Sequence, residues 1–298
     1  MNKSCPKVIV AVLHSSREDA LARTLDSIYK QEYPDFSVLV VDTGATEQLA
    51  ARLQSQFPQL RYVKARSAGG VASGKKLAVD QALALDGEFV FLTDNDIELD
   101  RFCLARLMDT LLRVPRAGVA APILFHENGG VLSAGGIYLR LLGQPILKKS
   151  LPAETRAVDF VTGAIGLYRK AALQKTGPFD SLFDPYGFED IDHGLRLKNR
   201  GYSLHMVAGA RGRHISSYSF HEETGFFLYH TTKNRLLCAY KHVPRGFFFL
   251  TFLPWFGCRR MVVPVAKFFL MGKFSLASEV IRGVKDGMSC LASIHKNP

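Results

Sequence analysis

Short apolar runs alternate with amphipathic segments through most of the chain. Buried strands are predicted by three runs rich in β-branched or aromatic residues, at 7–13, 36–41 and 89–92. Between the first two runs, Leu21, Leu25 and Ile28 recur at the spacing of one helix face, which predicts a helix over 17–31. Strand, helix and strand in this order form a βαβ unit, whose ligand sites lie at the carboxyl ends of parallel strands. We therefore expect an α/β fold with a mostly parallel sheet.

The same patterns extend along the rest of the chain. Further strands are expected at 60–65, 119–125 and 158–169, and further helices at 47–56, 101–113, 170–175 and 189–201. The inner strand at 158–169 contains Gly163, where the backbone can approach a ligand closely. Residues 126–150 are rich in glycine and alternate only weakly, which is typical of a hairpin or a mobile flap over a site.

Two carboxylates follow the apolar run at 89–92. Asp94 and Asp96 stand two residues apart at the predicted strand end, in the sequence GEFVFLTDNDIEL. Neighbouring carboxylates repel each other unless a cation lies between them, and oxygen ligands favour Mg²⁺ or Mn²⁺, whose shell is usually completed by water and substrate phosphates. The pair therefore predicts a metal and pyrophosphate site. On these residues alone, the alternative is a turn in which Asp96 or Asp100 caps the next helix.

A glycine-rich segment offers a second candidate phosphate site. Gly69 to Lys75 matches the G-x-x-x-x-G-K pattern of a P-loop, and a helical pattern follows it. This is the basis of an alternative function, a nucleotide-hydrolysing protein that uses Gly69 to Lys76. Against it, Lys76 stands where a P-loop needs Ser or Thr for Mg²⁺, and the segment follows the third strand. The simpler interpretation is a glycine loop with solvated lysines.

Three acids occupy the start of the helix predicted in PYGFEDIDHGLRLKNRGY: Glu189, Asp190 and Asp192. Acids in a first helical turn often serve only as partners of the helix dipole, so a functional role needs independent support. For Asp192 we favour a structural role, as a cap or as the partner of Arg196.

Composition and charge limit the classes of molecule that the chain is expected to bind. With 298 residues, 47% apolar and 22% charged, the chain is an ordinary globular protein. Its formal charge is +11, of which residues 241–298 carry +7. A basic tail on a nearly balanced domain argues against a nucleic-acid groove and for a local anionic partner. The five cysteines are scattered, with no zinc spacing, and indicate reduced thiols in a cytoplasmic protein.

The tail is aromatic as well as basic. Residues 246–258 form an uncharged stretch of thirteen, followed by two arginines, and Pro254 and Pro264 are expected to interrupt any spanning helix. We expect an in-plane helix at 246–285 that contacts an anionic membrane surface, which would place the protein peripherally on the inner face of the cell membrane. The alternative is that the phenylalanines pack on the main domain or form a dimer contact.

The order of these motifs resembles the family 2 inverting glycosyltransferases of the GT-A fold, especially the bacterial rhamnosyltransferase-like branch. The resemblance runs from Lys7 to about Pro244, with a weaker echo in IRGVKDG at 281–287. It implies a Rossmann-like, mostly parallel sheet flanked by helices. The GT-A catalytic domain would span 1–240, with a nucleotide-sugar half over about 1–120 and an acceptor half over about 121–240, and a helical extension would follow over 241–298.

The resemblance also implies roles on the donor side. The Asp that ends the second strand contacts the nucleotide in this family, which points to Asp42. The acidic pair after the later strand holds a divalent metal and the donor diphosphate, which points to Asp94 and Asp96. A later His, often a metal or phosphate contact, matches His214 in GRHISSYS.

On the acceptor side, the Glu-Asp motif of the family matches Glu189 and Asp190. Asp190 would be the general base, and Glu189 would orient the acceptor or its loop. The stretch YHTTKNRLLCAYKH is similar to a helix of the rhamnosyltransferase-like branch and places Tyr229, Asn234 and Arg235 near the donor phosphates or the acceptor, with Arg235 assigned to the donor.

Two departures from the family concern the donor. The first strand ends in Leu13-His14-Ser15, where the family usually has Thr-Tyr-Asn or similar, so His14 takes the donor-facing position. Lys75 stands where many members have Asn, and we expect it to reach a donor phosphate.

The predicted function is metal-dependent, inverting transfer of a hexose or deoxyhexose. The sugar would move from a nucleotide-sugar donor to a hydroxyl of a glycan or lipid-linked acceptor in cell-surface polysaccharide synthesis. The alternatives are the P-loop protein and a non-catalytic glycan- or nucleotide-binding module on the same fold.

Overall fold

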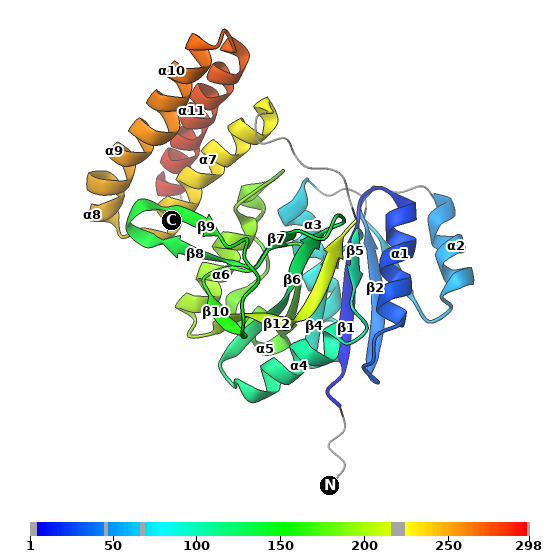
Figure 1. Ribbon diagram of the computed structural model, residues 1–298. Coiled ribbons are helices and arrows are strands. Elements are labelled where there is room, and N and C mark those ends of the chain that lie inside the picture. Colours follow the sequence, from blue (N-terminus) through cyan, green and yellow to red (C-terminus); the bar gives the residue numbers. More distant parts are fainter. Residues whose placement is uncertain (1–4, 45–46, 66–68, 216–223, 297–298) are drawn as a thin grey trace.

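A computed structural model describes residues 5–44, 47–65, 69–215 and 224–296 of the chain. Within these residues, ten strands form one mixed sheet and two more form a separate hairpin (Figure 1). The main sheet has the order β10-β12-β6-β11-β4-β1-β2-β3, with β5 beside β12 and β7 beside β6. Its strands are β1 (Val8–His14), β2 (Phe36–Asp42), β3 (Arg61–Lys64), β4 (Phe89–Asp94), β5 (Ile97–Leu99), β6 (Ala117–His126), β7 (Val131–Ser133), β10 (Arg156–Val158), β11 (Ile165–Arg169) and β12 (Ser203–His214). The separate hairpin pairs β8 (Gly136–Leu139) with β9 (Gln144–Leu147).

Helices cover both faces of the sheet. One face packs against α1 (Glu18–Tyr29), α2 (Glu47–Gln56) and α4 (Cys103–Arg113), and the other against α3 (Val71–Leu83), α5 (Lys170–Thr176) and α6 (Glu189–Asn199). Short 3₁₀ turns occur at η1 (Arg140–Leu142) and η2 (Ser181–Phe183). Along β1, Val8, Val10 and Val12 point to the first set of helices, and Ile9 and Ala11 to the second. A strand covered on both faces must be apolar throughout, which explains its continuous apolar sequence.

The parallel centre of the sheet brings the strand ends together. β1 pairs in parallel with β2 and β4, and β6 pairs in parallel with β12, while β11 runs antiparallel between β4 and β6. In this register His14 lies opposite Asp42, and Leu13 lies opposite Asp94. The observed sheet confirms the predicted mixed, mostly parallel α/β fold and gathers these residues at one edge.

The predicted strand at 158–169 is wrong as a single element. β10 ends at Val158 and pairs with β12 at the sheet edge, whereas β11 begins at Ile165 in the middle of the sheet. Gly163 lies in the connection between them. β12, over 203–214, was not predicted, because its glycines and charged residues obscure the alternation of buried positions.

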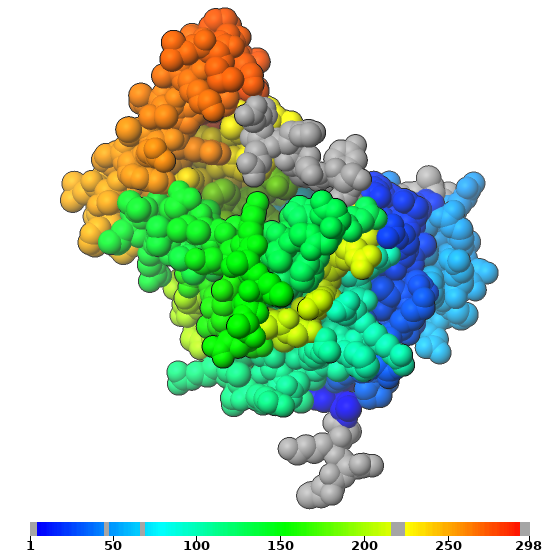
Figure 2. Space-filling model, viewed as in Figure 1, coloured from blue at the N-terminus to red at the C-terminus, as the bar shows by residue number. Residues whose placement is uncertain are grey.

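A helical unit follows the sheet. It consists of α7 (Gly225–His242), one continuous helix over Arg245–Leu270, and α11 (Phe274–Lys296). The middle helix comprises α8 (Arg245–Phe247), the π-helical η3 (Phe248–Phe252), α9 (Leu253–Phe256), the π-helical η4 (Gly257–Val262) and α10 (Val263–Leu270). Figure 2 shows the upper part of this unit as a lobe that projects beyond the rest of the molecule.

The expectation that Pro254 and Pro264 interrupt this helix is wrong. A proline removes one backbone donor and crowds the preceding turn, yet here each proline comes two residues after a π-helical segment ends. The wider π turns give the ring room, and the helix continues. By length and composition it could cross a membrane, and only 17% of its most apolar 18-residue window is buried.

Two glycines bring α11 close to α7. A Cβ at Gly283 would lie 2.7 Å from the carbonyl oxygen of Tyr229, and a Cβ at Gly287 would lie 2.9 Å from the side chain of Leu236. The close packing of α11 against α7 therefore explains why the segment IRGVKDG has glycine at these two positions.

Candidate functional site

His14 and Asp42 are buried next to each other where β1 and β2 end. Asp42 Oδ1 accepts a hydrogen bond from the Gly44 N–H at 2.9 Å, and Oδ2 accepts one from the Tyr62 hydroxyl. Burial lowers the pKa of His14, against the opposing charge of Asp42, so the ring is neutral at pH 7. Neither ring nitrogen has a hydrogen-bond partner within the described residues. A buried imidazole with two unmatched nitrogens suits a polar ligand at this edge.

The predicted metal ligands meet at the same edge. β5 pairs with β12 so that His214 lies opposite Ile97, the residue after Asp96. Asp96 Oδ1 is 3.6 Å from His214 Nε2, and Asp94 ends β4 two residues earlier. Residues 216–223, which include the end of the GRHISSYS motif, lie outside the described residues.

A buried ion pair joins the two acidic motifs. Lys75 Nζ lies 2.8 Å from Glu189 Oε1, and the two side chains are 3% and 8% exposed. Burial alone would lower the pKa of Lys75, but the charges of Glu189, Asp94 and Asp190 raise it. The acids after β4 and those that begin α6 therefore converge on one ammonium group. The interpretation of Lys75 as a solvated lysine is wrong, because its charge is buried and bound to Glu189. The contact of Lys75 with a donor phosphate stays a prediction.

Asp190 is held by the main chain. Its Oδ1 accepts a hydrogen bond from the Ile191 N–H at 2.8 Å, and its Oδ2 accepts one from the Gly163 N–H at 3.2 Å. A Cβ at Gly163 would lie 2.3 Å from Lys75 Nζ and 3.2 Å from Glu189 Oε1. Only glycine fits here, because any side chain would displace the ion pair. The backbone at Gly163 approaches other groups closely, as predicted, and these groups include the side chains of Glu189 and Asp190.

Burial raises the pKa of two carboxyl groups in the cluster. The pKa of Asp94 rises to about 7, because burial and the charges of Asp96 and Glu189 outweigh the charge of Lys75. The pKa of Asp190 rises to about 6, because burial and Glu189 outweigh Lys75 and the two backbone hydrogen bonds. A fixed carboxylate with a pKa near neutrality is suited to accept a proton.

A divalent cation at the end of the cluster, where Asp94, Asp96 and His214 lie, would need ligands from outside the chain as well. Carboxylate oxygens and an imidazole nitrogen are ligands for Mn²⁺ or Mg²⁺, and the repulsion between the two aspartates is what a cation would relieve. Within the described part of the chain, no group of three or more His, Cys, Asp or Glu side chains could hold a metal by itself. A metal here would therefore complete its shell with water and donor phosphates.

The glycine-rich segment is not a phosphate-binding loop. Asp184 Oδ1 accepts hydrogen bonds from the backbone N–H groups of Ala72 and Ser73, at 2.9 and 3.2 Å, and Oδ2 accepts one from the Ser73 hydroxyl. These donors at the start of α3 are the ones that a P-loop offers to phosphate. Because a carboxylate already satisfies them, the alternative function based on Gly69 to Lys76 is wrong. Asp184 was not predicted, because its Asp-Pro pair signals only a turn.

Asp192 has the structural role that was predicted. It is fully buried and lies 2.8 Å from Arg196 Nε, 2.7 Å from Lys241 Nζ and 2.8 Å from His242 Nε2. Burial alone would raise the pKa of Asp192, but the hydrogen bond with His242 and the charges of Lys241 and Arg196 hold it well below its usual range. The residue thus anchors α6 to α7.

Arg235 contacts the β8–β9 hairpin and the middle helix. Its Nε donates to the Gly143 carbonyl at 3.1 Å, its Nη2 donates to the side chain of Gln144, and its guanidinium lies 4.7 Å from the ring centroid of Trp255. These contacts join α7 to the turn of the β8–β9 hairpin and to the middle helix. None of these contacts is with a residue at the strand ends, so they lend no support to the assignment of Arg235 to the donor, which stays a prediction.

The other two predicted residues of α7 also have partners within the protein. Asn234 Nδ2 donates to three carbonyls of the loop 183–187, just before the Glu-Asp motif. The Tyr229 hydroxyl donates to Asp286 Oδ2 at 2.8 Å. Both side chains hold α7 in place and do not contact the strand ends.

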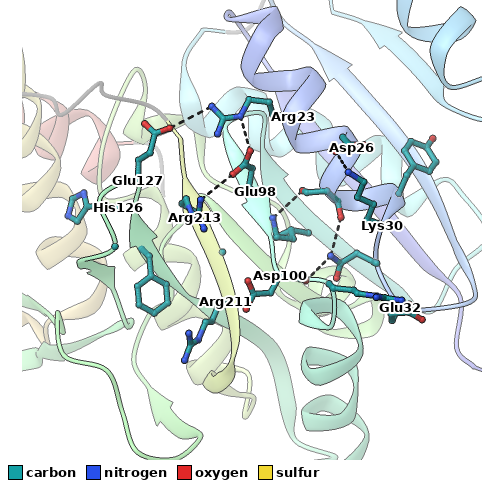
Figure 3. A pocket seen from close by; sticks show the side chains of 18 of the residues that line it. Arg23, Asp26, Lys30, Glu32, Glu98, Asp100, His126, Glu127, Arg211 and Arg213 are labelled. Carbon is teal, nitrogen blue, oxygen red and sulfur yellow. Dashed lines mark hydrogen bonds and ion pairs between the residues drawn. The ribbon is translucent and has the colours of Figure 1, made fainter.

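A cavity of about 1090 Å³ lies on the other side of β12 (Figure 3). Side chains alternate along a strand, so Arg213 lines this cavity, whereas the next residue, His214, contacts Asp96. Arg23 within the cavity pairs with Glu98 and with Glu127. The predicted site residues are all described, and none of them lines this cavity, which is therefore separate from the acidic cluster.

The chain is similar to known enzymes and solved structures. It is 26% identical over 261 residues to the N-acetylglucosaminyl-diphospho-decaprenol L-rhamnosyltransferase of Mycobacterium tuberculosis, a match covering 74% of this chain and 83% of the relative. It is 30% identical over 231 residues to the O-antigen biosynthesis protein RfbC of Myxococcus xanthus, covering 73% of this chain but 18% of that protein. Mannosyltransferase PcManGT of Pyrobaculum calidifontis, solved with GDP-Man and Mn²⁺, has a TM-score of 0.60 at 16% identity, covering 96% of this chain and 88% of that one, and shows the GT-A fold.

The family model described as "Glycosyltransferase like family 2" matches residues 6–239. This range is most of the chain and contains every residue of the acidic cluster. The chain therefore belongs to glycosyltransferase family 2, as the motifs implied, and is a glycosyltransferase.

Proposed function

We propose that the protein transfers a sugar, with inversion, from a nucleotide-sugar donor to a hydroxyl of a lipid-linked glycan in cell-surface polysaccharide synthesis. The observation that carries this proposal is the convergence of the two acidic motifs on Lys75. The relatives support the substrate classes, because one is named for rhamnosyl transfer to a diphospholipid-linked sugar and another for O-antigen biosynthesis.

Asp190 acts as the general base. Its carboxylate takes the proton of the acceptor hydroxyl while that oxygen bonds to the anomeric carbon, a contribution of roughly 10²- to 10⁴-fold in rate. The bond to the nucleoside diphosphate breaks on the opposite face, and its electron pair leaves with the diphosphate. Two backbone N–H groups, of Gly163 and Ile191, fix both oxygens of Asp190 and so orient the lone pair that accepts the proton.

Glu189 and Lys75 position this base. Their ion pair fixes the start of α6, where Asp190 is the second residue. The ammonium of Lys75 also opposes the rise in the pKa of Asp190, so it keeps the base deprotonated at neutral pH. Both residues act through Asp190 in this proposal.

The donor would bind along the edge that begins at β2. Asp42 and His14 would contact the nucleoside, because they lie buried at the ends of β2 and β1. Asp94, Asp96 and His214 would hold Mn²⁺ or Mg²⁺. The chemistry that a bound metal supplies is neutralisation of charge on the departing diphosphate. The mannosyltransferase of the same fold, solved with GDP-Man and Mn²⁺, is consistent with this assignment.

The middle helix would rest on the inner face of the cell membrane. Leu250 and Leu270 are 82% and 91% exposed, and Arg259 and Lys267 on the same helix are also exposed. Apolar side chains flanked by cations favour an interfacial position on anionic lipid. We prefer this position to a membrane-spanning one, because α10 packs against α11, whose charged residues would enter the hydrocarbon.

Release of nucleoside diphosphate from a panel of UDP-, GDP- and dTDP-sugars, with Mn²⁺ and a lipid-linked acceptor, tests the function. Wild type is expected to turn over one donor class, and Asp190→Asn is expected to lose at least about 100-fold in rate while still binding that donor. Donor binding is read from thermal stabilisation, about 2.7 kcal/mol at a hundred times Kd. Full turnover by Asp190→Asn would refute the base, and donor binding without release from any donor would indicate a non-catalytic module.

The metal is tested by a separate measurement, the affinity for the donor. Asp96→Ala and His214→Ala are expected to weaken donor binding measured by calorimetry with Mn²⁺, and EDTA is expected to remove the difference between variants and wild type. Equal donor affinity of wild type with Mn²⁺ and with EDTA would refute the metal site.

A further inference from the structure

Two arginines that have no carboxylate partner among the described residues lie on α7 and on the middle helix. Arg235 on α7 is 8% exposed, and Arg260 on η4 is half-buried. Within the described residues their hydrogen bonds go to neutral groups. Arg235 binds the Gly143 carbonyl and the Gln144 side chain, and Arg260 Nη2 donates to the Thr231 hydroxyl at 2.6 Å. Two positive charges are thus at least partly removed from water, and the part of the chain that the structure describes gives them no counter-charge.

Burying two like charges in this way lowers the stability of the folded protein. A buried charge without a partner loses its hydration, and a second like charge nearby adds repulsion. Burial, and then the charge of Arg260, lower the pKa of Arg235 to about 10. Arg260 Nε is buried and has no hydrogen-bond partner in the described part of the chain. Asp286 on the adjoining α11 bonds to Tyr229 instead. An anionic ligand would supply the missing counter-charge and the missing acceptor.

Asn234 and Arg235 together connect the loop before the Glu-Asp motif to the exposed apolar helix that carries Arg260. Asn234, the residue before Arg235, donates to the Gly187 carbonyl at 2.9 Å, immediately before the helix that begins with the Glu-Asp motif. On the other side, Arg235 stacks on Trp255 of the middle helix, which also carries Arg260. Arg260 lies in a π-helical turn, a distortion that is frequent at functional sites.

On the basis of the proposed function, we propose that Arg235 and Arg260 bind the diphosphate of the lipid-linked acceptor. Planar guanidinium groups match phosphate oxygens in charge and in geometry. The sugar on the diphosphate then extends toward Asp190, and the lipid follows the exposed apolar face of the middle helix. The site is distinct from the donor edge, where the strand ends and His214 lie.

The only tryptophan of the chain provides a direct probe. Trp255 stacks on Arg235 at 4.7 Å, so its fluorescence reports on ligands of the arginine pair. The ligand used is farnesyl diphosphate, kept below its critical micelle concentration, with farnesol as the uncharged control. Wild type is expected to show a saturable change with farnesyl diphosphate and none with farnesol. The absence of any response to farnesyl diphosphate would overturn the proposal.

A matched pair of variants tests the assignment. Arg260→Gln is expected to raise the Kd for farnesyl diphosphate at least about tenfold, the loss of one charged hydrogen bond. Arg259→Gln removes the same charge from the exposed preceding residue and is expected to leave this Kd unchanged. Equal Kd values for the two variants would overturn the proposal. If circular dichroism shows Arg260→Gln to be unfolded, Arg260→Lys replaces it, with a rise of about threefold expected because the fork geometry is lost.

Two further comparisons distinguish failure of the diphosphate site from failure of the proposed function. Donor turnover without farnesyl diphosphate binding would refute the diphosphate site and leave the proposed function standing, whereas binding without turnover of any donor would refute the proposed function alone. Vesicles of phosphatidylglycerol supply the other source of phosphate. A Trp255 response to these vesicles that Arg260→Gln abolishes, with no response to farnesyl diphosphate, would assign the pair to a phospholipid headgroup and overturn the acceptor role.

Discussion

In the proposed function, Lys75 would contribute to both stability and catalysis. It is buried with Glu189 and acts on the charges of Asp94 and Asp190, so three carboxylates depend on a single cation. Removing one partner of a buried ion pair is far more costly than removing both, because it leaves a charge with no compensation.

Lys75→Met is therefore expected to destabilise the protein by about 3 kcal/mol, and the double variant with Glu189→Gln is expected to recover part of that loss. Lys76→Met is the control, because Lys76 forms an exposed i,i+4 pair with Asp80 and should cost less than about 1 kcal/mol. Urea unfolding measures all three. A Lys75→Met loss equal to that of Lys76→Met would show that the pair is not a buried contact.

The pH dependence of turnover follows from Asp190. The base accepts a proton only when it is ionised, and burial raises its pKa to about 6, so activity is present above this pH and is lost as the pH falls through it. We expect kcat/KM, measured from pH 5 to 8 at saturating Mn²⁺, to fall about tenfold per unit below the pKa. The melting temperature across the same range controls for unfolding. A flat profile would be incompatible with Asp190 as the base.

At the scale of elements, the helical unit depends on close contact between α7 and α11. Gly283 and Gly287 let the two helices approach, and Tyr229 bonds to Asp286 across the same contact. The packing, in turn, fixes α7, whose Asn234 supports the loop that precedes the Glu-Asp motif. The helical unit thus supports, from outside the sheet, the loop that precedes Asp190, the proposed base.

Gly283→Ala tests this contact. The added Cβ would lie 2.7 Å from a backbone oxygen, so one helix must shift, at an expected cost of about 1–3 kcal/mol in unfolding free energy. Gly257→Ala is the matched control, because nothing lies within 4 Å of its Cβ, and alanine should stabilise the helix by up to about 1 kcal/mol. Thermal unfolding compares them. Equal stability of both variants would contradict the observed closeness of α7 and α11.

At the scale of the whole molecule, one end of the structure is apolar and basic, while the acidic cluster lies on the main domain. The middle helix is part of the projecting lobe (Figures 1 and 2). Arg260 lies on this helix, and Arg235 contacts it through Trp255. This arrangement would hold the acidic cluster above a membrane surface, within reach of an acceptor whose lipid stays in the bilayer.

Membrane contact is tested by flotation with phosphatidylglycerol vesicles. Leu250→Glu with Leu270→Glu is expected to abolish flotation, because both side chains are exposed on the apolar helix. Leu112→Glu is the control, since Leu112 is 55% exposed on α4 of the catalytic domain. Alkaline carbonate should extract the wild-type protein if the helix lies in the interface. Retention of the protein in the bilayer after carbonate, or equal flotation of both variants, would contradict the interfacial position.

Local patterns in the sequence were sufficient to predict the strands that end at Asp42 and Asp94 and the helix that begins at Glu189. Each depends on neighbours within one turn or one strand, and parallel strands bring their ends together whatever the rest of the chain does. The strand at 158–169 was wrong because its apolar run gave no sign that β10 and β11 belong to separate places in the sheet.

Only the tertiary structure decided which partner each polar side chain finds. Lys75 bonds to Glu189 across 114 residues, and Asp184 caps α3 across 112. Arg235 bonds to the β8–β9 hairpin 92 residues earlier in the chain, and no sequence pattern predicted that contact. A buried charge takes the partner that the packed backbone brings within reach, and that choice depends on the whole fold, since neither partner's neighbours along the chain encode it.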